Sequence, residues 1–342
     1  MIRTWQILLI ANAISISSCL ELTDFETPLH NQELVVDGFV STKNEPHYVK
    51  LTTLAGIDAL GNNLLGQNAH VEIQEVNGPR VILGEISPGR YQLEAGALVV
   101  EEGKSYQLHI RLQNGDTYSS SVETVPKPIN VVSSEAVLKN IADEDVLSPD
   151  SLVHNIEMEI ENIDDNHFFI TQSDGWAKVK LGFVSCKTRP PPSRDLCWQF
   201  RESIDRGALN IQSNIGLSRE NYKITSVTIP VDSRLTYIGL VDINAMPSSS
   251  YEYWRLIKEQ LDRPGGLFDA PFRPITGNIL NESTNISALG FFHTYATTSE
   301  IVCYDRSEVN AVFETPWSAC IRCVEWYPNS TWDNIDEILC SN

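Results

Sequence analysis

Residues 105–121 read SYQLHIRLQNGDTYSSS and carry the clearest structural signal of the chain. Four apolar residues alternate with polar ones in its first half, in the period-two pattern of a strand with one buried face: Tyr106, Leu108, Ile110 and Leu112. The dipeptide Asn114-Gly115 follows, and it favours the positive φ angles of a tight hairpin turn. A second strand-like run resumes at Thr117, so the stretch predicts a β-hairpin whose apolar face belongs to a core.

Further strand-like runs of the same kind surround this hairpin. They cover residues 33–41, 47–54, 69–76, 80–87, 90–95 and 117–125, with a second turn signal at Asn77-Gly78. Short strands separated by turns roughly every eight to twelve residues are typical of a β-sandwich. We therefore predict a mainly β protein whose first domain, residues 33–125, is an Ig-like sandwich.

A proline-rich segment follows the first domain. In ETVPKPIN, Pro126 and Pro128 lack backbone donors and hold the preceding residues extended, so residues 126–130 are predicted to be a linker. A second β-rich domain is predicted over residues 131–302. Its expected strands are residues 152–160, 167–172, 176–186, 196–200, 208–213, 222–230, 236–244 and 288–297.

One helix is predicted near residues 250–262. Ser249 lies three residues before Glu252, the spacing of a capping box, and Pro264-Gly265-Gly266 is expected to end the helix. Spacings of three and four place a stripe of apolar side chains on one face: Tyr251, Trp254, Ile257 and Leu261. Such a stripe is more typical of core packing than of a ligand platform.

The first 18 residues resemble the signal peptide of a bacterial lipoprotein. Arg3 precedes a short apolar run, which is too short to span a bilayer about 30 Å thick, and Ile16-Ser17-Ser18-Cys19 has the order of a lipobox. We predict cleavage before Cys19, lipidation of Cys19 with palmitate among the acyl chains, and a tether over residues 19–32. The alternative is a plain secretory signal with a coincidental cysteine.

The chain is strongly acidic. Its 342 residues have a formal net charge of −20, which becomes −21 when Arg3 leaves with the signal peptide. A field of this sign repels nucleic acid and anionic lipid headgroups, so neither is an expected partner. The length exceeds that of a usual single core and predicts about two domains.

Six cysteines remain after Cys19 is assigned to lipid: Cys186, Cys197, Cys303, Cys320, Cys323 and Cys340. An even number in an exported protein predicts three disulfides. Cys186 and Cys197 bracket a proline-rich loop, so we pair these two, while the other four belong to a cysteine-rich segment, residues 303–342, and allow three pairings. Cys320 and Cys323 form a CxxC, for which a structural disulfide is favoured over a redox or zinc site.

No catalytic motif stands out in the sequence. Three histidines lie in strand-like runs, where a half-buried imidazole is the ordinary interpretation: His154, His167 and His293. Carboxylate pairs such as Glu157/Glu159 and Asp164/Asp165 have no specificity in so acidic a chain. The acidic residues 143–150 lack the glycine and the final glutamate of a calcium loop, so a solvated loop is favoured. We expect no enzymatic activity, no cofactor and no metal.

Several motifs together resemble a known family. The runs LVVDGFVS, YVKLTTL, NAHVEIQEVNG, GRYQLEA and SYQLHIRLQNGDTYSSSVETVPKPI, then ITGNILN, ALGFFHTYATTSEIV and CIRC, are similar to the Bacteroidota lipoproteins catalogued as domain-of-unknown-function family 4249. The first domain also resembles carboxypeptidase-regulatory-like sandwiches. The sequence departs from the family after Cys323, where VEWYPNSTWDNIDEILC replaces a glycine-bearing turn.

The resemblance implies a role without naming a reaction. Such lipoproteins are typically encoded beside TonB-dependent outer-membrane receptors, which implies a non-enzymatic accessory of a nutrient transporter that captures or retains a ligand. Glu21, Asp24 and Glu26 resemble an acidic export signal, which implies the outer membrane, with a lipid anchor at the cell surface. A structural or adhesive module and, less favoured, a hydrolytic surface enzyme are the alternatives. The sequence names no ligand and no ligand-binding residues.

Overall fold

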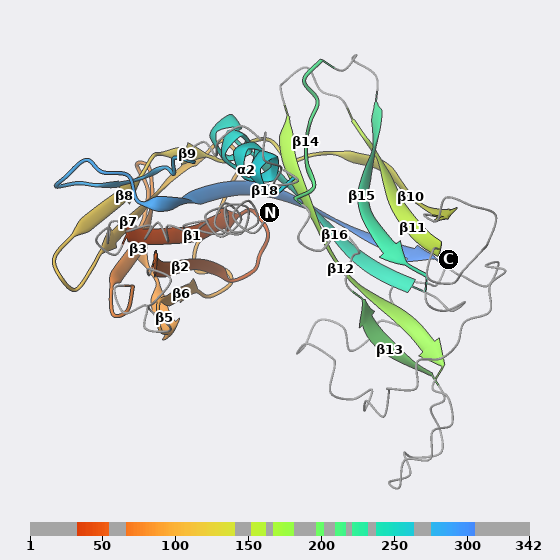
Figure 1. The fold of residues 1–342 in the computed structure, drawn as a ribbon, viewed down its shortest axis with the longest axis horizontal. Coiled ribbons are helices and arrows are strands. Elements are labelled where there is room, and N and C mark those ends of the chain that lie inside the picture. Colours follow the sequence, from red (N-terminus) through yellow and green to blue (C-terminus); the bar gives the residue numbers. More distant parts are fainter. Residues whose placement is uncertain are drawn as a thin grey trace, which may run out of the picture.

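The protein folds into two β-sandwich lobes joined by one long strand (Figure 1). The computed structural model describes residues 33–54, 66–140, 152–161, 167–180, 196–201, 209–216, 221–231, 237–262 and 275–304. Within these ranges the chain is almost entirely β, with several sheets and one helix, so the predicted fold class is confirmed. None of the described helical residues forms a segment long and apolar enough to cross a membrane.

Two sheets form the first sandwich. One sheet has the order β18-β1-β2-β6-β5, and its strands are β1 (Glu33–Ser41), β2 (His47–Leu54), β5 (Gly84–Ser87), β6 (Arg90–Leu93) and the first part of β18 (Leu289–Tyr304). The other sheet has the order β17-β8-β7-β3-β4, with β9 paired to β7. Its strands are β3 (His70–Glu75), β4 (Arg80–Ile82), β7 (Ser105–Arg111), β8 (Thr117–Ser120), β9 (Glu123–Thr124) and β17 (Ile279–Asn281).

The alternation of residues 105–112 produces the core of this sandwich. Tyr106, Leu108 and Ile110 are buried, and they belong to the same apolar cluster as Val36 of β1 and Val49 of β2 in the opposite sheet. Asn114-Gly115 turns the chain between β7 and β8, with Gly115 at φ 94°. Because alternate residues of the longer strands, such as β3 and β7, reach this cluster, the sandwich follows from the period-two pattern.

Two of the predicted runs each divide into two strands. Residues 80–87 form β4 and β5, which pair with β3 and β6 respectively and so lie in different sheets. Leu83 stands at the crossing, is buried, and donates its backbone N–H to the carbonyl of Val71. Residues 117–125 likewise form β8 and β9. The run 80–87 thus changes its partner strand, whereas β8 and β9 both pair with β7. An alternating pattern records neither interruption.

The strand β18 connects the two lobes. Its residues 289–295 pair in parallel with β1, and its residues 296–304 pair antiparallel with β16 (Tyr237–Met246). Gly290 opens the strand at φ 89°, where an added Cβ would lie 1.8 Å from the Val36 carbonyl oxygen. Only glycine therefore permits the backbone of β18 to approach β1 this closely.

The second sandwich extends from the other half of β18. One sheet continues through β16, β12 (Phe168–Lys180) and β13 (Leu196–Arg201), with β14 (Ile211–Ser213) paired to β12. The other sheet has the order β10-β11-β15, with β10 (Val131–Asn140), β11 (Leu152–Ile160) and β15 (Tyr222–Pro230). Apolar residues of both sheets join the cluster that fills the first sandwich, so the core continues from lobe to lobe.

The strand pairing crosses the predicted domain boundaries. Residues 279–281 and 289–295, expected in the second domain, pair with β8 and β1 of the first sandwich, respectively. Residues 131–140, where no strand was predicted, form β10. In the predicted linker 126–130, Ile129 is buried and its carbonyl accepts a hydrogen bond from Thr298 of β18. This segment is therefore packed against the core, because its apolar side chain and its carbonyl both find partners there.

The single described helix, α2 (Ser248–Leu261), matches the predicted helix closely, but its start differs. Pro247 is the N-cap, and no side-chain cap hydrogen bond forms. The predicted capping box is wrong, because the Ser249 hydroxyl instead donates to a carboxylate oxygen of Glu123 at 2.6 Å. Leu261, predicted on the packed stripe, is the last residue of the helix and is 63% exposed.

Candidate functional site

The outer face of the first sandwich presents charged and aromatic side chains on four neighbouring strands. Residues that alternate with the core-facing ones point away from the core, and the register places them in rows. One row joins Phe291, Asp37, Lys50 and Arg90, from β18, β1, β2 and β6. In the next row His293 lies opposite Phe39, and Tyr48 follows on β2 beside Phe39. The two rows therefore form one continuous surface.

Helix α2 covers the β18 end of this surface. The Tyr253 ring lies 4.8 Å from the Phe291 ring, and the Trp254 ring stacks on His293 at 5.2 Å and 13°. The indole N–H of Trp254 donates to the Tyr295 hydroxyl at 3.3 Å. Ring pairs at these separations stabilise the contact beyond their buried area. The aromatic side chains of α2 and β18 therefore fix the helix on the sheet.

His293 lies at the centre of this aromatic packing and is only 3% exposed. Its Nδ1 is 3.1 Å from the hydroxyl oxygen of Ser250, which is itself fully buried. Burial lowers the pKa of His293 from 6.5 to about 3, because the apolar surroundings disfavour the charged imidazolium. The ring is therefore neutral at physiological pH and packs as a structural residue, more deeply than the predicted half-buried imidazole.

Asp37 occupies the open part of the face. Its side chain is exposed beside Tyr48 and Tyr253, and within the described chain its carboxylate accepts no hydrogen bond. Desolvation by the surrounding atoms raises the pKa of Asp37, and the charge of Lys50 opposes that rise. Burial also raises the pKa of Tyr48 and of Tyr253, and the negative charge of Asp37 raises both further. The carboxylate and the two phenols are therefore close enough to act on one another.

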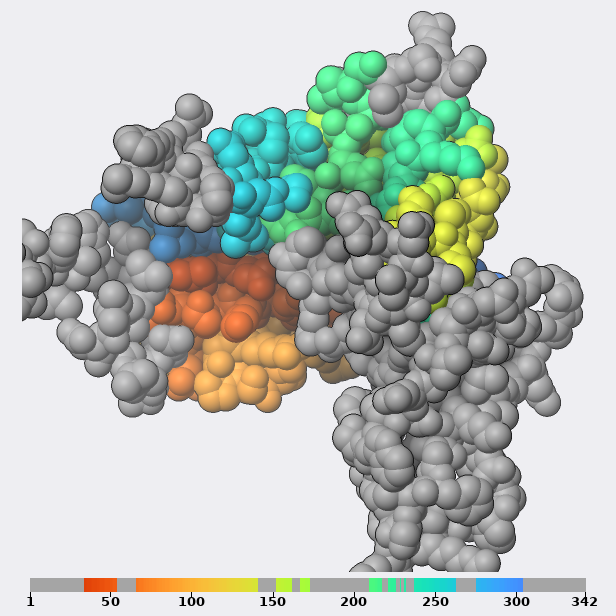
Figure 2. All heavy atoms as spheres, turned by 45° about the vertical axis from the view of Figure 1, so that its right-hand side comes forward, coloured from red at the N-terminus to blue at the C-terminus, as the bar shows by residue number. Residues whose placement is uncertain are grey.

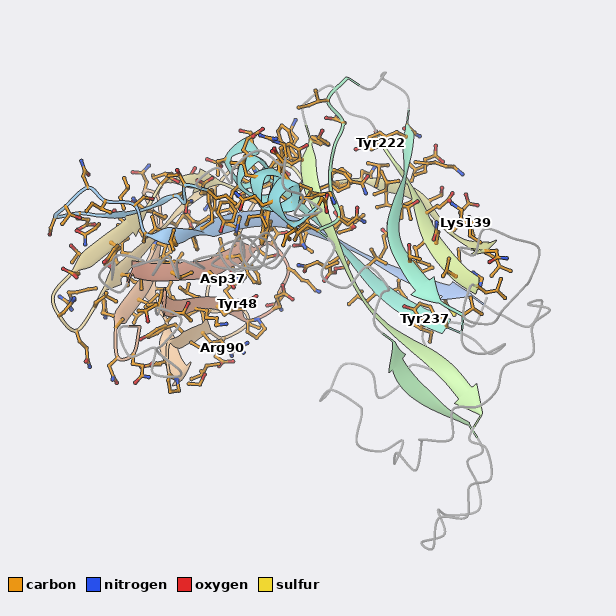
Figure 3. The ribbon with its side chains drawn as sticks, viewed as in Figure 1. Asp37, Tyr48, Arg90, Lys139, Tyr222 and Tyr237 are labelled. Carbon is orange, nitrogen blue, oxygen red and sulfur yellow. The ribbon has the colours of Figure 1, made fainter. Side chains whose placement is uncertain are left out.

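Arg90 completes the surface on the side away from α2. Its guanidinium carbon lies 5.4 Å from the centre of the Tyr48 ring, within cation–π range. The Tyr48 ring also meets Phe39 edge-on at 4.8 Å. Figure 3 labels Asp37, Tyr48 and Arg90 on the adjacent strands β1, β2 and β6. We call the five residues Asp37, Tyr48, Lys50, Arg90 and Tyr253 the Asp37 patch.

The patch lies on an accessible side of the molecule. In Figure 2 the red and orange atoms of β1 and β2 come to the surface directly beside the cyan atoms of α2. Asp37, Lys50 and Arg90 are all exposed, whereas the aromatic residues of β18 lie buried under the helix. A layer of stacked rings thus supports an exposed, charged surface.

A second buried acid, Glu123, has a structural role. It is 4% exposed and accepts hydrogen bonds from the hydroxyls of Ser121 and Ser249, both at 2.6 Å, and from the Asn278 amide at 3.1 Å. These donors come from three segments: the β8–β9 connection, α2 and the residue before β17. Because both of its oxygens accept hydrogen bonds from these donors, Glu123 fastens the helix to the first sandwich.

Within the part of the chain that the structure describes, the other residues weighed from the sequence do not come together in one group. His154 and His167 are buried at different positions of the second sandwich. Glu157 pairs with Lys139 at 2.9 Å, and Glu159 accepts a hydrogen bond from Asn221 at 3.2 Å. Among the described residues no cluster of three or more His, Cys, Asp or Glu could hold a metal ion. Asp164, Asp165 and the acidic residues 143–150 lie outside the described residues.

Most of the predicted modification sites also lie outside the described residues. These are Cys19 with the signal and tether, residues 1–32, and four cysteines: Cys186, Cys320, Cys323 and Cys340. Cys197 lies on β13, and Cys303, near the end of β18, is disulfide-bonded. The three-disulfide scheme and the lipidation stay predictions.

The sequence pattern did not single out the Asp37 patch. Asp37 and Lys50 appeared only as polar positions of two alternating runs, and the partner of Asp37 on its other side, Phe291, lies about 250 residues away along the chain. The one local signal was the run FFHTYA at 291–296, which is apolar or aromatic on both faces of a strand. Such a run indicates a strand covered on both sides.

The family model described as "Domain of unknown function (DUF4249)" matches residues 21–301. The chain belongs to this family. The resemblance drawn from the sequence motifs is thereby confirmed, and the match includes all described strands except the last residues of β18. No curated protein matches this DUF4249 chain.

Two solved structures are similar to parts of this DUF4249 protein. The chicken interferon gamma receptor alpha chain is 9% identical, with 63% of this chain and 90% of that chain covered and a TM-score of 0.20. The FN1–FN3 domains of chicken CNTN1 are 12% identical, with 62% of this chain and 60% of that chain covered and a TM-score of 0.23. At these scores neither likeness bears on function.

Proposed function

We propose that this DUF4249 protein is a lipid-anchored, non-enzymatic binding protein of the outer membrane. In this proposal it captures or retains a ligand for a TonB-dependent receptor at the cell surface. The observation that carries the binding role is the Asp37 patch, where charged side chains stand exposed on a rigid aromatic floor. The receptor partnership rests on the family resemblance, and the anchor rests on Ile16-Ser17-Ser18-Cys19.

The architecture suits binding more than catalysis. Binding surfaces are commonly built from side chains held on rigid elements, whereas four of the described histidines, His47, His154, His167 and His293, are buried in packed cores. Glu123 has its acceptors occupied by three donors, and His293 is held neutral beneath α2. A histidine–carboxylate contact does occur on the surface, where His70 Nε2 lies 3.3 Å from Glu72 Oε2, but Glu72 is also paired with Arg80. We therefore favour a positioned binding surface over an acid–base site.

A lipid anchor would make a weak partnership effective. The segment between Cys19 and Glu33 can extend to at most roughly 50 Å, which keeps the folded lobes close to the membrane. Two partners confined in this way meet at a high effective concentration, so a modest interface suffices. A stable complex would still be expected to bury at least about 1,000 Å².

The test combines affinity purification with surface proteolysis. The tagged full-length protein is extracted from native membranes in mild detergent, and co-purifying outer-membrane proteins are identified by mass spectrometry. Intact cells are treated with protease in parallel, and a palmitate analogue labels lipoproteins. We expect a TonB-dependent receptor to co-purify, the protein to be cleaved on intact cells, and Cys19→Ala to abolish labelling.

Specific outcomes would contradict the proposal. Recovery of the protein without any receptor would contradict the accessory role and favour a structural or adhesive module. Full protection from protease on intact cells would place the protein on the periplasmic side. Wild-type protein that is not labelled by the palmitate analogue would contradict the lipid anchor.

A further inference from the structure

We propose that the Asp37 patch recognises a small organic cation that carries an alkylated ammonium group. The inference deepens the proposed binding role by naming the chemistry of the ligand, and it rests on that role. Three features support it. The Asp37 carboxylate accepts no hydrogen bond among the described residues, the Arg90 guanidinium lies over the Tyr48 ring, and the whole chain is strongly acidic.

The open acceptor is the Asp37 carboxylate. Among the described residues no side chain or backbone group donates a hydrogen bond to it, and no ion pair within 4.0 Å joins it to Lys50. The hydroxyls of Tyr48 and Tyr253 likewise have no hydrogen-bond partner within the described chain. A negative charge that is partly desolvated and has no partner among the described residues gains most from a ligand of opposite charge.

The aromatic setting adds a second attraction for the same kind of ligand. Aromatic rings attract cations through the negative electrostatic potential of their faces, and alkylated ammonium ions lose little hydration on meeting them. Tyr48 already holds the Arg90 guanidinium at 5.4 Å from its ring centre, which shows that a cation is accommodated at this ring. Tyr253 stands on the other side of the patch, fixed against Phe291 at 4.8 Å. An ammonium group at Asp37 would thus meet the carboxylate and both tyrosines.

The charge of the whole chain acts in the same direction. A formal net charge of −20 draws cations toward the surface and raises their local concentration. Lys50 and Arg90 oppose this attraction, because both are cations in the row of Asp37. Lys50 is the nearer of the two along that row, and its charge lowers the pKa of the Asp37 carboxyl. A cationic ligand therefore competes with Lys50 for Asp37, whereas an anionic or zwitterionic ligand would use Lys50 and Arg90 as partners.

The role of Lys50 makes the proposal directly testable. Isothermal titration of the purified full-length protein in detergent uses choline as the probe and 3,3-dimethylbutan-1-ol as the neutral molecule of the same shape. We expect choline to bind at least about tenfold more tightly than the neutral molecule, which is ~1.4 kcal/mol. Asp37→Asn should weaken choline binding about tenfold, and Lys50→Gln should strengthen it about threefold.

Matched variants separate the patch from the overall charge. Glu102→Gln removes one exposed acid on the connection between β6 and β7, outside the patch, and should leave choline affinity unchanged within about twofold. Tyr48→Leu should weaken choline binding about fivefold while the urea midpoint confirms folding. A choline Kd weaker than about 10 mM, or equal binding of both probes, would overturn the proposal. Weaker choline binding by Lys50→Gln would also overturn it and indicate an anionic or zwitterionic ligand.

Failure of this inference can be told apart from failure of the proposed function. Receptor co-purification is repeated with the Asp37→Asn variant. If the receptor is retained and choline binding is lost, both proposals stand. If wild-type protein binds choline but recovers no receptor, the ligand chemistry stands and the accessory role fails. If it recovers the receptor but does not discriminate between the two probes, the accessory role stands and the ligand chemistry fails.

Discussion

Acidification should destabilise the folded protein through His293, the histidine that is buried beneath α2. In the folded protein burial lowers the pKa of His293 to about 3, whereas the unfolded chain has the ordinary value of 6.5. Between pH 6.5 and pH 3, His293 is therefore protonated in the unfolded state but neutral in the folded state. The contribution of the neutral His293 ring to the free energy of unfolding is fully present above pH 6.5. It declines as the pH falls and is lost near pH 3.

The size of this effect follows from proton linkage. Each pH unit between the two pKa values removes about 1.4 kcal/mol of stability per histidine, so acidification from pH 7 to pH 5 should remove roughly 2 kcal/mol through His293. Burial also lowers the pKa of His47 and of His109, and both add to the loss in the same direction. Two kcal/mol is a large share of the stability of an ordinary domain.

Urea unfolding at pH 7, 6 and 5 measures the effect in the wild type and two variants. His293→Phe keeps the stacked ring but cannot titrate, so its stability should fall by roughly 2 kcal/mol less than that of the wild type between pH 7 and pH 5. Ser250→Ala removes the hydroxyl that lies 3.1 Å from the imidazole and leaves the titrating ring in place. It should lower stability by about 1 kcal/mol at every pH, with the wild-type pH dependence retained. If His293→Phe shows the full wild-type pH dependence, the assignment of the linkage to His293 is refuted.

Three further variants test other features of the fold by urea unfolding. Gly290→Ala should destabilise the protein by more than about 3 kcal/mol, because its Cβ would meet the Val36 carbonyl at 1.8 Å; a wild-type midpoint would contradict the close approach of β18 to β1. Tyr222→Phe should stabilise the protein by up to about 1 kcal/mol, since the buried Tyr222 hydroxyl has no hydrogen-bond partner among the described residues; a loss of stability would reveal one. Glu123→Gln should destabilise the protein by about 2 kcal/mol and speed hydrogen exchange in α2, because a neutral amide replaces the carboxylate that Ser249 donates to. Unchanged exchange in α2 would show that Glu123 does not fasten the helix.

Local pattern determined much of the secondary structure of this protein. The predicted ranges 33–41, 47–54, 152–160 and 222–230 coincide with β1, β2, β11 and β15. Each of these strands has one face in the core, so apolar and polar residues alternate along it and the strand can be predicted from its own residues. Strand β10 escaped prediction because it is an edge strand whose side chains are half-buried or exposed, and no alternation survives there.

The sequence by itself determined the β class, the acidic charge, the signal pattern and the family of this protein. The tertiary structure alone decided that β17 and the first half of β18 pair with strands of the first sandwich. It further decided that the Ser249 hydroxyl donates to Glu123 instead of capping its own helix. It also decided that Asp37 stands between Phe291 and Lys50. The physical reason is that alternation specifies which face of a strand is buried, whereas the identity of the neighbouring strand depends on packing across the whole chain.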